Sequence, residues 1–269
     1  MKDLVIKLVL GLSLLVSPGF AELLWYGDPA RGRAVFNNLN FEGTQRYGKG
    51  SGTILPAVDP VHGPIWRVYK PAPDRRAEIR GATGFSHHVG KGGVVKEGET
   101  YYLGWRYKFN MPEKKMKGWA CFQWKSYPEP NQPDSRTQEY PVLMGYNGRE
   151  MTVTKYGSGW KKHRDRIVPI WSKPVSIGIW VDVVLVIKLS RDKEVGYLEF
   201  YFNGEKQTLL TGGTRVYHNT MDGWEVAPKW GAYNRHVIGT EITVDLADLR
   251  IGTDLKAVMP TLVTGQFKR

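Results

Sequence analysis

The feature that most constrains the fold is an alternation of apolar and polar residues with a period of two. It is clearest in residues 101–109, where four large apolar residues face one way while Arg106 and Lys108 face the other. Successive side chains of a β-strand point to opposite faces. The segment therefore predicts a strand with one buried face.

Similar segments recur along the chain, separated by Gly and Pro, and no long amphipathic helix pattern is present. The Asn203-Gly204 dipeptide favours a tight hairpin. Many strands with turns between them predict an all-β fold, a concanavalin-like β-sandwich or jelly roll with one concave sheet. The further strand segments are residues 65–69, 180–189, 196–202 and 241–251.

The first 21 residues have the pattern of a secretory signal peptide. A short charged start precedes an apolar run at residues 8–16, and small residues follow at Gly19 and Ala21. The run is too short to span a bilayer. We expect residues 1–21 to be removed and residues 22–269 to form a single domain. That domain would be secreted or periplasmic, monomeric and not inserted in a membrane.

Charge and cysteine content narrow the partners. The formal net charge is +12, from 38 Lys and Arg against 26 Asp and Glu. An exported basic protein meets little nucleic acid, so an acidic polysaccharide is the expected partner. The single cysteine, Cys121, excludes an internal disulfide and is expected to be a packed small side chain.

Three segments combine an apolar face with a face rich in Arg, Lys, Gln and Tyr. If their strands are neighbours in one sheet, the polar faces merge into one basic groove; the alternative is three separate solvated faces. Gly231 would leave room for a ligand to lie close to the backbone. The polar-face residues are Arg76, Glu78 and Arg80 of residues 75–80, Gln123 and Lys125 of residues 119–125, and Lys229, Gly231, Tyr233 and Arg235 of residues 228–235.

The same segments resemble motifs of a known family. Residues 76–79 (Arg-Ala-Glu-Ile) resemble the Arg-x-Glu-Leu motif of jelly-roll alginate lyases. Residues 123–125 (Gln-Trp-Lys) resemble their Gln-x-His motif, and residues 229–234 resemble Lys-Ala-Gly-x-Tyr-Asn. Residues 178–245 are more similar to glucuronan lyase and heparin lyase I. The resemblance covers most of the mature chain and implies a polysaccharide lyase, closest in type to glucuronan lyase.

Such a lyase cuts a uronic acid chain by β-elimination. The proton at C5 leaves, the bond to O4 breaks, and a double bond forms. The neighbouring carboxylate must first be neutralised, for which the resemblance implies Gln123 and Arg76. Tyr233 is the candidate for the acid at O4 and also for the base at C5, since nearby cations favour a phenolate.

The identity of the base stays open at this point. Lys125 departs from the family pattern, which has a histidine there. In glucuronan lyases a histidine well before the glutamine is implicated, and His87 and His88 lie in a comparable place. Adjacent strand residues face opposite sides, so at most one of them would point into the groove. Tyr233 alone, or Lys125 in its neutral form, are the other candidates.

Further residues are expected to support binding or the fold. Glu78 would hold Arg76 or Arg80 in place; the alternative is that it serves as a second acid/base carboxylate. No cluster has the spacing of a catalytic metal site. The resemblance allows a structural calcium, for which Glu42 and Asp245 could supply oxygens; the alternative is two ordinary surface carboxylates. The expected substrate-binding residues are Lys229, Lys125, Arg80, Glu78, Arg235 and Arg106.

The first choice of substrate is a glucuronan-like β-1,4-linked polymer of glucuronic acid. Alginate and a heparin-like glycosaminoglycan are the alternatives within the same chemistry. A non-catalytic, lectin-like domain would keep the basic face without needing Tyr233. A glycoside hydrolase needs two carboxylates at the scissile bond, whereas the three polar segments carry only Glu78 on their polar faces.

Overall fold

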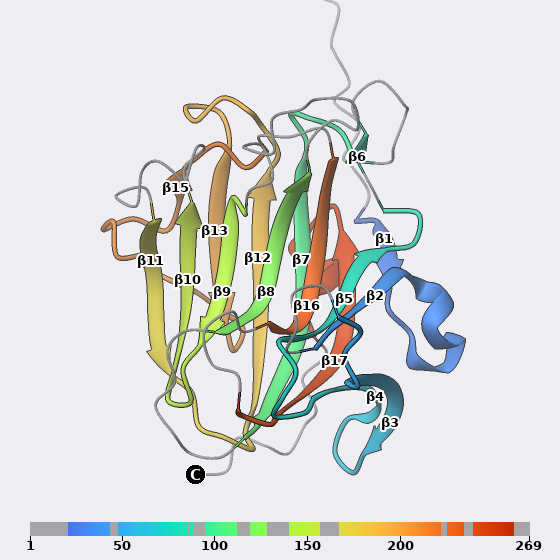
Figure 1. The fold of residues 1–269 in the computed structure, drawn as a ribbon. Coiled ribbons are helices and arrows are strands. Elements are labelled where there is room, and N and C mark those ends of the chain that lie inside the picture. The colour runs from blue at the N-terminus through green and yellow to red at the C-terminus, as the bar shows by residue number, and fades with distance from the viewer. Residues whose placement is uncertain are drawn as a thin grey trace, which may run out of the picture.

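The alternating segments pair into two antiparallel sheets that pack face to face (Figure 1). The computed structural model describes residues 21–43, 48–85, 87–88, 95–111, 119–127, 140–156, 167–221, 225–233 and 239–260. The predicted all-β sandwich is confirmed. No helix in these segments is long and apolar enough to cross a bilayer.

The sheet at the front of Figure 1 is called the front sheet, and the other the rear sheet. The front sheet runs in the order β11 (Ile167–Pro174), β10 (Glu150–Tyr156), β9 (Val142–Tyr146), β8 (Trp119–Tyr127), β16 (Glu225–Tyr233), β5 (Arg76–Ala82) and β2 (Phe36–Glu42), and β6 (His87–His88) pairs with β16.

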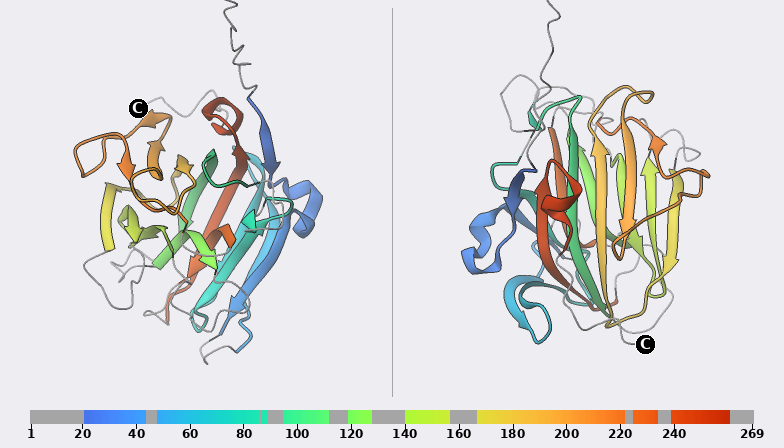
Figure 2. Two further views of the ribbon diagram at one scale, coloured as in Figure 1. Left: turned by 90° about the horizontal axis from the view of Figure 1, so that it is seen from above. Right: turned by 180° about the vertical axis from the view of Figure 1, so that it is seen from behind.

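The rear sheet runs in the order β14 (Glu205–Lys206), β13 (Tyr197–Phe202), β12 (Trp180–Lys188), β7 (Thr100–Asn110), β17 (Ile242–Gly252), β4 (Gly63–Lys70) and β3 (Thr53–Asp59), with β1 (Leu23–Tyr26) on β17 and β15 (Val216–Tyr217) on β13. A 3-10 helix, η1 (Pro29–Val35), follows β1. The short helix α1 (Leu255–Val258) lies on the outer side of the rear sheet, against β17 and β7 (Figure 2).

Aromatic side chains from both sheets form the core. Trp105 of β7 stacks on Phe122 of β8 with 4.8 Å between ring centroids, and it meets Trp230 of β16 edge-on at 6.0 Å. All three side chains are fully buried. Burying one large apolar side chain contributes about 1.5–3 kcal/mol, so this contact across the sheets fixes which faces of β8 and β16 point outward.

Two local predictions are confirmed. Asn203 and Gly204 both have positive φ, 50° and 83°, as a tight two-residue hairpin between β13 and β14 requires. Cys121 is fully buried and its thiol approaches the carbonyl oxygen of Met144 at 3.4 Å. Burial raises the pKa of this thiol to about 12, so Cys121 is a packing residue.

Gly231 serves a different purpose from the one predicted. Its φ is 139°, and a Cβ there would lie 2.4 Å from the carbonyl oxygen of Ala77 and 2.9 Å from the Cα of Glu78. The space beside Gly231 is therefore taken by the backbone of β5, and the expectation that a ligand would lie there is wrong. The glycine permits the close approach of β16 to β5.

We expect Gly231→Ala to lower the free energy of unfolding by at least about 1–3 kcal/mol, the cost of a strained backbone conformation. Urea denaturation measures the loss. Gly213→Ala is the control, because a Cβ there would meet no atom closer than 3.6 Å. Equal stability of the two variants would contradict the close approach of β16 to β5.

Candidate active site

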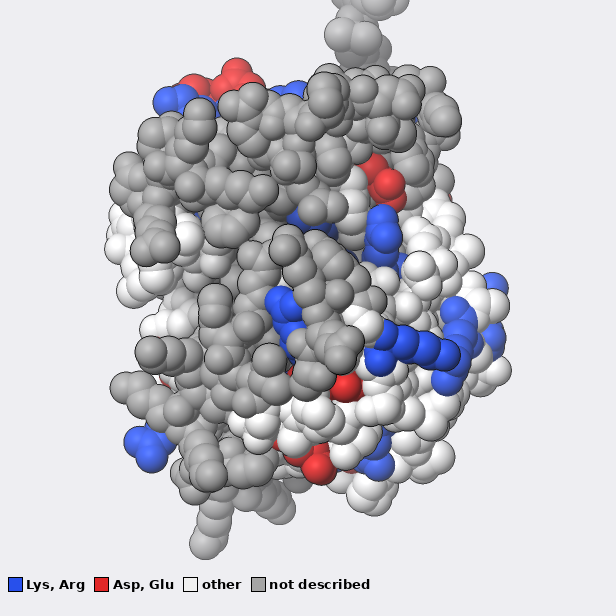
Figure 3. All heavy atoms as spheres, in the orientation of Figure 1, with Lys and Arg blue, Asp and Glu red and all other residues white. Residues whose placement is uncertain are grey.

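The three predicted polar segments are neighbours in the front sheet. β16 pairs with β8 on one side and with β5 on the other, so that Lys229 lies opposite both Gln123 and Arg80. Tyr233 lies opposite Arg76. Because the alternate residues of these strands fill the core, the polar faces merge on the outer side of the sheet. Lys and Arg side chains, with fewer acidic ones, are visible at separate points over the middle and right of this face (Figure 3).

Glu78 lies at the centre of this face and is 1% exposed. The amide nitrogen of Gln123 donates to its Oε1, and Lys229 Nζ lies 2.7 Å from its Oε2. Arg76 Nε lies 3.4 Å from the same Oε2. We call these four residues the Glu78 cluster. Gln123 and Lys229 are 0% and 3% exposed, and a buried ammonium needs such an anionic partner.

Tyr233 stands beside this cluster at the end of β16. The guanidinium carbon of Arg76 lies 3.9 Å from the centroid of the Tyr233 ring. Arg76 is also held by Glu42, whose Oε1 lies 3.4 Å from its Nη1. Burial acts to lower the pKa of Arg76, but the carboxylates of Glu78 and Glu42 raise it. A permanent cation thus lies against the phenol ring.

Lys125 is surrounded by aromatic rings. It is 4% exposed, and its Nζ lies 3.9 Å from the ring centroid of Tyr140 and 5.7 Å from that of Tyr127. The guanidinium of Arg80 lies 4.4 Å from the other aromatic neighbour, the Tyr127 ring. Ring faces attract a cation and not a neutral amine. This environment favours Lys125 as a binding cation over Lys125 as a neutral base.

The predicted histidines lie at the opposite end of β16 from Tyr233. His87 pairs with Val226 and His88 with Glu225. Val226 and Tyr233 are seven positions apart, which is about 23 Å along an extended strand. For a histidine of β6 and Tyr233 to act on the same sugar, their side chains would have to span this separation of the backbone positions. The His87 and His88 side chains, and Arg235, lie outside the described residues.

Arg106 was predicted to bind substrate, and this prediction is wrong. It lies in β7 and points outward from the rear sheet. Its Nε lies 2.9 Å from Asp182 and 3.7 Å from Asp248, and its Nη1 lies 2.6 Å from Nδ1 of His62. Arg106 therefore neutralises rear-sheet carboxylates on the far side of the sandwich.

Glu42 and Asp245 do not share a calcium site. Glu42 lies in the front sheet beside Arg76, whereas Asp245 is fully buried in the rear sheet. Asp245 receives Arg67 at 2.7 Å and Lys108 at 3.3 Å. In the part of the chain that the structure describes, no three metal-ligating side chains gather at one point.

Lys108 bridges two rear-sheet carboxylates, because its ammonium also lies 2.5 Å from Asp59. Burial acts to raise the pKa of Asp59, but this contact and the backbone N–H groups of Val61 and His62 lower it to about 2. The ammonium thus occupies the position between carboxylates that a metal cation could otherwise hold.

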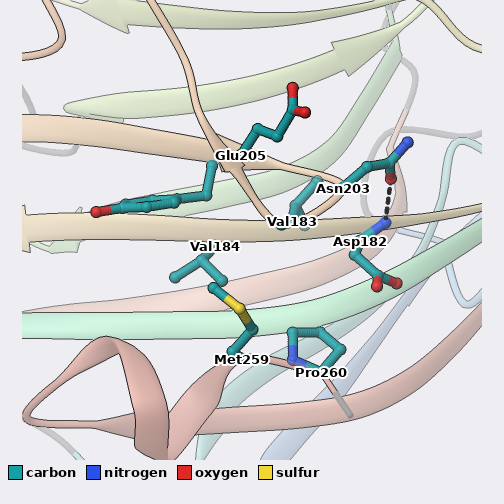
Figure 4. Close-up of a pocket in the computed structure, with 9 residues that line it drawn as sticks. Asp182, Val183, Val184, Asn203, Glu205, Met259 and Pro260 are labelled. Carbon is teal, nitrogen blue, oxygen red and sulfur yellow. Dashed lines mark hydrogen bonds between the residues drawn. The ribbon is translucent and has the colours of Figure 1, made fainter. Parts of the chain in front are cut away.

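A pocket of about 310 Å³ lies on the rear sheet (Figure 4). At its rim Asn203 accepts a hydrogen bond from the backbone N–H of Asp182 at 2.9 Å. Val184 and Met259 give it apolar walls. The pocket shares no residue with the polar face of the front sheet, so it belongs to a different surface from the candidate active site.

Sequence reasoning missed the contribution of β2. Asn38, Asn40 and Glu42 lie opposite Arg80, Glu78 and Arg76 on the same outer face. The alternation was visible in residues 36–42 (Phe-Asn-Asn-Leu-Asn-Phe-Glu), but asparagine is poorly represented in strands. Glu42, and Glu225 on β16, also show that Glu78 is one of several carboxylates on this face.

The fold is a jelly roll whose front sheet carries cations and Tyr233 on its outer face. The model of the family "Polysaccharide lyase" matches residues 44–246. The chain therefore belongs to the polysaccharide lyase family, and it is a carbon–oxygen lyase that acts on polysaccharides.

Solved structures agree on the fold. The endo-β-1,4-glucuronan lyase of the fungus Trichoderma reesei superposes with a TM-score of 0.62 at 17% identity, over 89% of this chain and 99% of that one. A substrate complex of a variant of the family 7 alginate lyase A1-II′ gives 0.54 at 11% identity, over 85% and 97%. A carbohydrate esterase of the Shiga toxin-encoding bacteriophage phi24B gives 0.53 at 10%, over 87% and 100%. No curated protein matches the chain.

We expect Arg106→Ala to lower the free energy of unfolding by roughly 2–4 kcal/mol at pH 7, because Asp182 loses the cation at 2.9 Å and Asp248 keeps only Arg250 among the described residues. The loss should be smaller near pH 4, since burial raises the pKa of Asp182 and a protonated carboxyl needs no partner. Calorimetry at both pH values measures this. The control is Arg191→Ala, which breaks an exposed pair with Glu97 and should cost about 1 kcal/mol or less.

Proposed function

We propose that this lyase cleaves a polymer of uronic acids by β-elimination, with Tyr233 as its proton-transfer group. The observation that carries the proposal is the juxtaposition of Tyr233 and Arg76 on paired positions of β16 and β5, with the guanidinium 3.9 Å from the ring centroid. A group that transfers protons and a group that binds a carboxylate thereby meet at one point.

The first requirement of the reaction is to neutralise the carboxylate next to C5. Arg76 offers a planar, permanently charged donor, and Gln123 offers amide N–H groups two strands away. Both are held by Glu78, so they are oriented before substrate arrives. Fixed donors of this kind stabilise the enolate-like charge that develops when the C5 proton is removed.

The second requirement is to move one proton. Tyr233, as phenolate, takes the proton from C5, and the electron pair of that C–H bond forms the double bond between C4 and C5. The bond from C4 to O4 breaks, and its electron pair stays on O4. Tyr233, now a phenol, returns the proton to O4, which restores the enzyme. A histidine of β6 as base and Tyr233 as acid is the alternative division of labour.

The proposed substrate is a glucuronan-like β-1,4-linked polymer of glucuronic acid. The similarity of residues 178–245 to that type of lyase supports this choice, as does the fold shared with a glucuronan lyase. Alginate or a heparin-like glycosaminoglycan is the alternative. Lys229, Lys125 and Arg80 would bind the carboxylates of neighbouring sugars, because they extend the cationic face away from Tyr233.

The remaining proposals concern where the protein works and what it needs. The signal-peptide pattern of residues 1–21 supports export to the periplasm or medium. We propose that the mature domain is a monomer. Proton transfer by Tyr233 requires no metal.

Two alternative functions make different demands on this face. A lectin-like domain would not need Tyr233. A glycoside hydrolase would need two free carboxylates at the scissile bond, whereas Glu78 is buried against Gln123, Lys229 and Arg76, and Glu42 is paired with Arg76.

We expect Tyr233→Phe to reduce the rate of unsaturated product formation to near background while polymer binding persists. The substitution removes one oxygen and keeps the ring against Arg76. Absorbance of the unsaturated ends of cleaved glucuronan, alginate and heparin-like chains gives the rate, and calorimetric titration gives the affinity. Near-normal product release by this variant would overturn the proposal.

His87→Ala and His88→Ala, measured alongside Tyr233→Phe, show which group is the base. If one of them is as inactive as Tyr233→Phe, that histidine is the base and Tyr233 the acid. If both remain active, Tyr233 transfers both protons.

Affinity for the polymer should fall steeply with salt, because the binding face carries an excess of cations. Exposed charges are screened beyond a Debye length of about 8 Å at physiological ionic strength. Titrating Tyr233→Phe with uncleaved polymer at low and high salt measures this without turnover. An affinity that does not change with salt would contradict a cationic binding face.

A further inference from the structure

We propose that Glu78 is the positioning residue of this active site and does not itself contact the polysaccharide. It acts through the amide of Gln123, the ammonium of Lys229 and the guanidinium of Arg76. This inference rests on the proposed function and deepens it, because it names the group on which the substrate-binding residues depend.

Both carboxylate oxygens of Glu78 are engaged by groups of the protein itself. Its Oε1 accepts from the amide of Gln123, its Oε2 lies 2.7 Å from Lys229 Nζ, and Arg76 Nε forms an ion pair with the same Oε2 at 3.4 Å. An unpaired carboxylate would repel a polyanion, whereas this one is neutralised by two cations. The sequence predicted that Glu78 holds Arg76 or Arg80 and that it binds substrate, and these contacts favour the first role.

Glu78 orients the Gln123 amide through one of its two N–H bonds. Only an amide N–H, and not the amide oxygen, can donate to a carboxylate. Nε2 donates one hydrogen to Glu78 and keeps a second N–H, which is the group that would donate to the substrate carboxylate. The Oε1 of Gln123 is buried and has no hydrogen-bond partner among the described residues, so the contact with Glu78 is what sets the orientation of this amide.

Glu78 also keeps Lys229 charged. Burial lowers the pKa of Lys229, the Glu78 carboxylate raises it, and the cations Arg76 and Arg80 lower it further. Removing the carboxylate leaves only influences that favour the neutral amine. The other titratable groups on the outer faces of β2, β8 and β16 include Glu42 of β2, Lys125 and Tyr127 of β8, and Glu225 and Tyr233 of β16; β6, which pairs with β16, adds His87 and His88.

The test is Glu78→Gln, which keeps the size of the side chain and removes its charge. We expect kcat to fall about 10²–10³-fold, the usual effect of losing one oriented donor. The alkaline limb of kcat/KM should also move to lower pH, because Lys229 loses its proton earlier. Glu78→Asp, which keeps the charge, should restore the position of this limb at least in part.

Glu199→Gln is the matched control. Glu199 is another buried carboxylate that holds two cations, Lys206 at 2.7 Å and Arg215 at 2.6 Å, but it lies in the rear sheet. It should lose comparable stability without any change in kcat or in the pH profile. The double variant Glu78→Gln/Lys229→Met has no ammonium at position 229. Its kcat/KM profile should therefore lack the shifted alkaline limb.

Two results would overturn the proposal. One is a Glu78→Gln protein with an unshifted alkaline limb. The other is tighter polymer binding at unchanged kcat, which would mean that Glu78 faces the substrate. Titration of the Lys229 ammonium by NMR, in wild-type protein and Glu78→Asp, needs no substrate and gives the answer if Glu78→Gln does not fold. It also separates this proposal from the proposed function, which fails on its own if wild-type protein cleaves no polyuronate.

Discussion

The pairing of β16 with both β5 and β8 is the constraint on which the polar outer face of the front sheet depends. Trp230 and Ala232 are buried between the sheets, so the intervening residues of β16 must point outward. The backbone ladder then sets which side chains meet: Lys229 lies between Gln123 and Arg80, and Tyr233 lies beside Arg76. The positions of the proposed catalytic groups follow from hydrogen bonds of the main chain, which are more precise than contacts supplied by loops.

On this outer face, the charged side chains are arranged as cations paired with carboxylates. Each central cation of this face is paired with a carboxylate of the same face. Glu78 lies 2.7 Å from Lys229, and Glu42 lies 3.4 Å from Arg76, so the carboxylates hold these cations in place. The basic character seen in the composition is thus organised locally by acidic residues, and a count of charges alone would not reveal this.

Much of this arrangement could be predicted from the sequence, because a period of two is a local property. It identified the polar faces of β5, β8 and β16 and the hairpin at Asn203. It could not identify Arg106 correctly, because alternation tells which residues share a face of one strand and not which sheet the strand joins. The predicted calcium site of Glu42 and Asp245 failed for the same reason, because the two residues lie in different sheets. The role of Gly231 depends on the backbone of β5, which no local pattern encodes.

The ammonium of Lys108 has a consequence for where the protein can work. A bound metal ion leaves its site when the surrounding medium is depleted of it, but a cation attached to the chain stays at a fixed local concentration. The ion pairs of Lys108 with Asp59 and Asp245 therefore do not depend on the metal ions of the medium. Because the folded pKa of Asp59 is about 2, below its ordinary value of 3.8, the bridge is at full strength above pH 4 and weakens only as the pH falls toward 2. A protein that carries its own counter-ion can face dilute or acidic surroundings without losing the rear sheet against which its front sheet is packed.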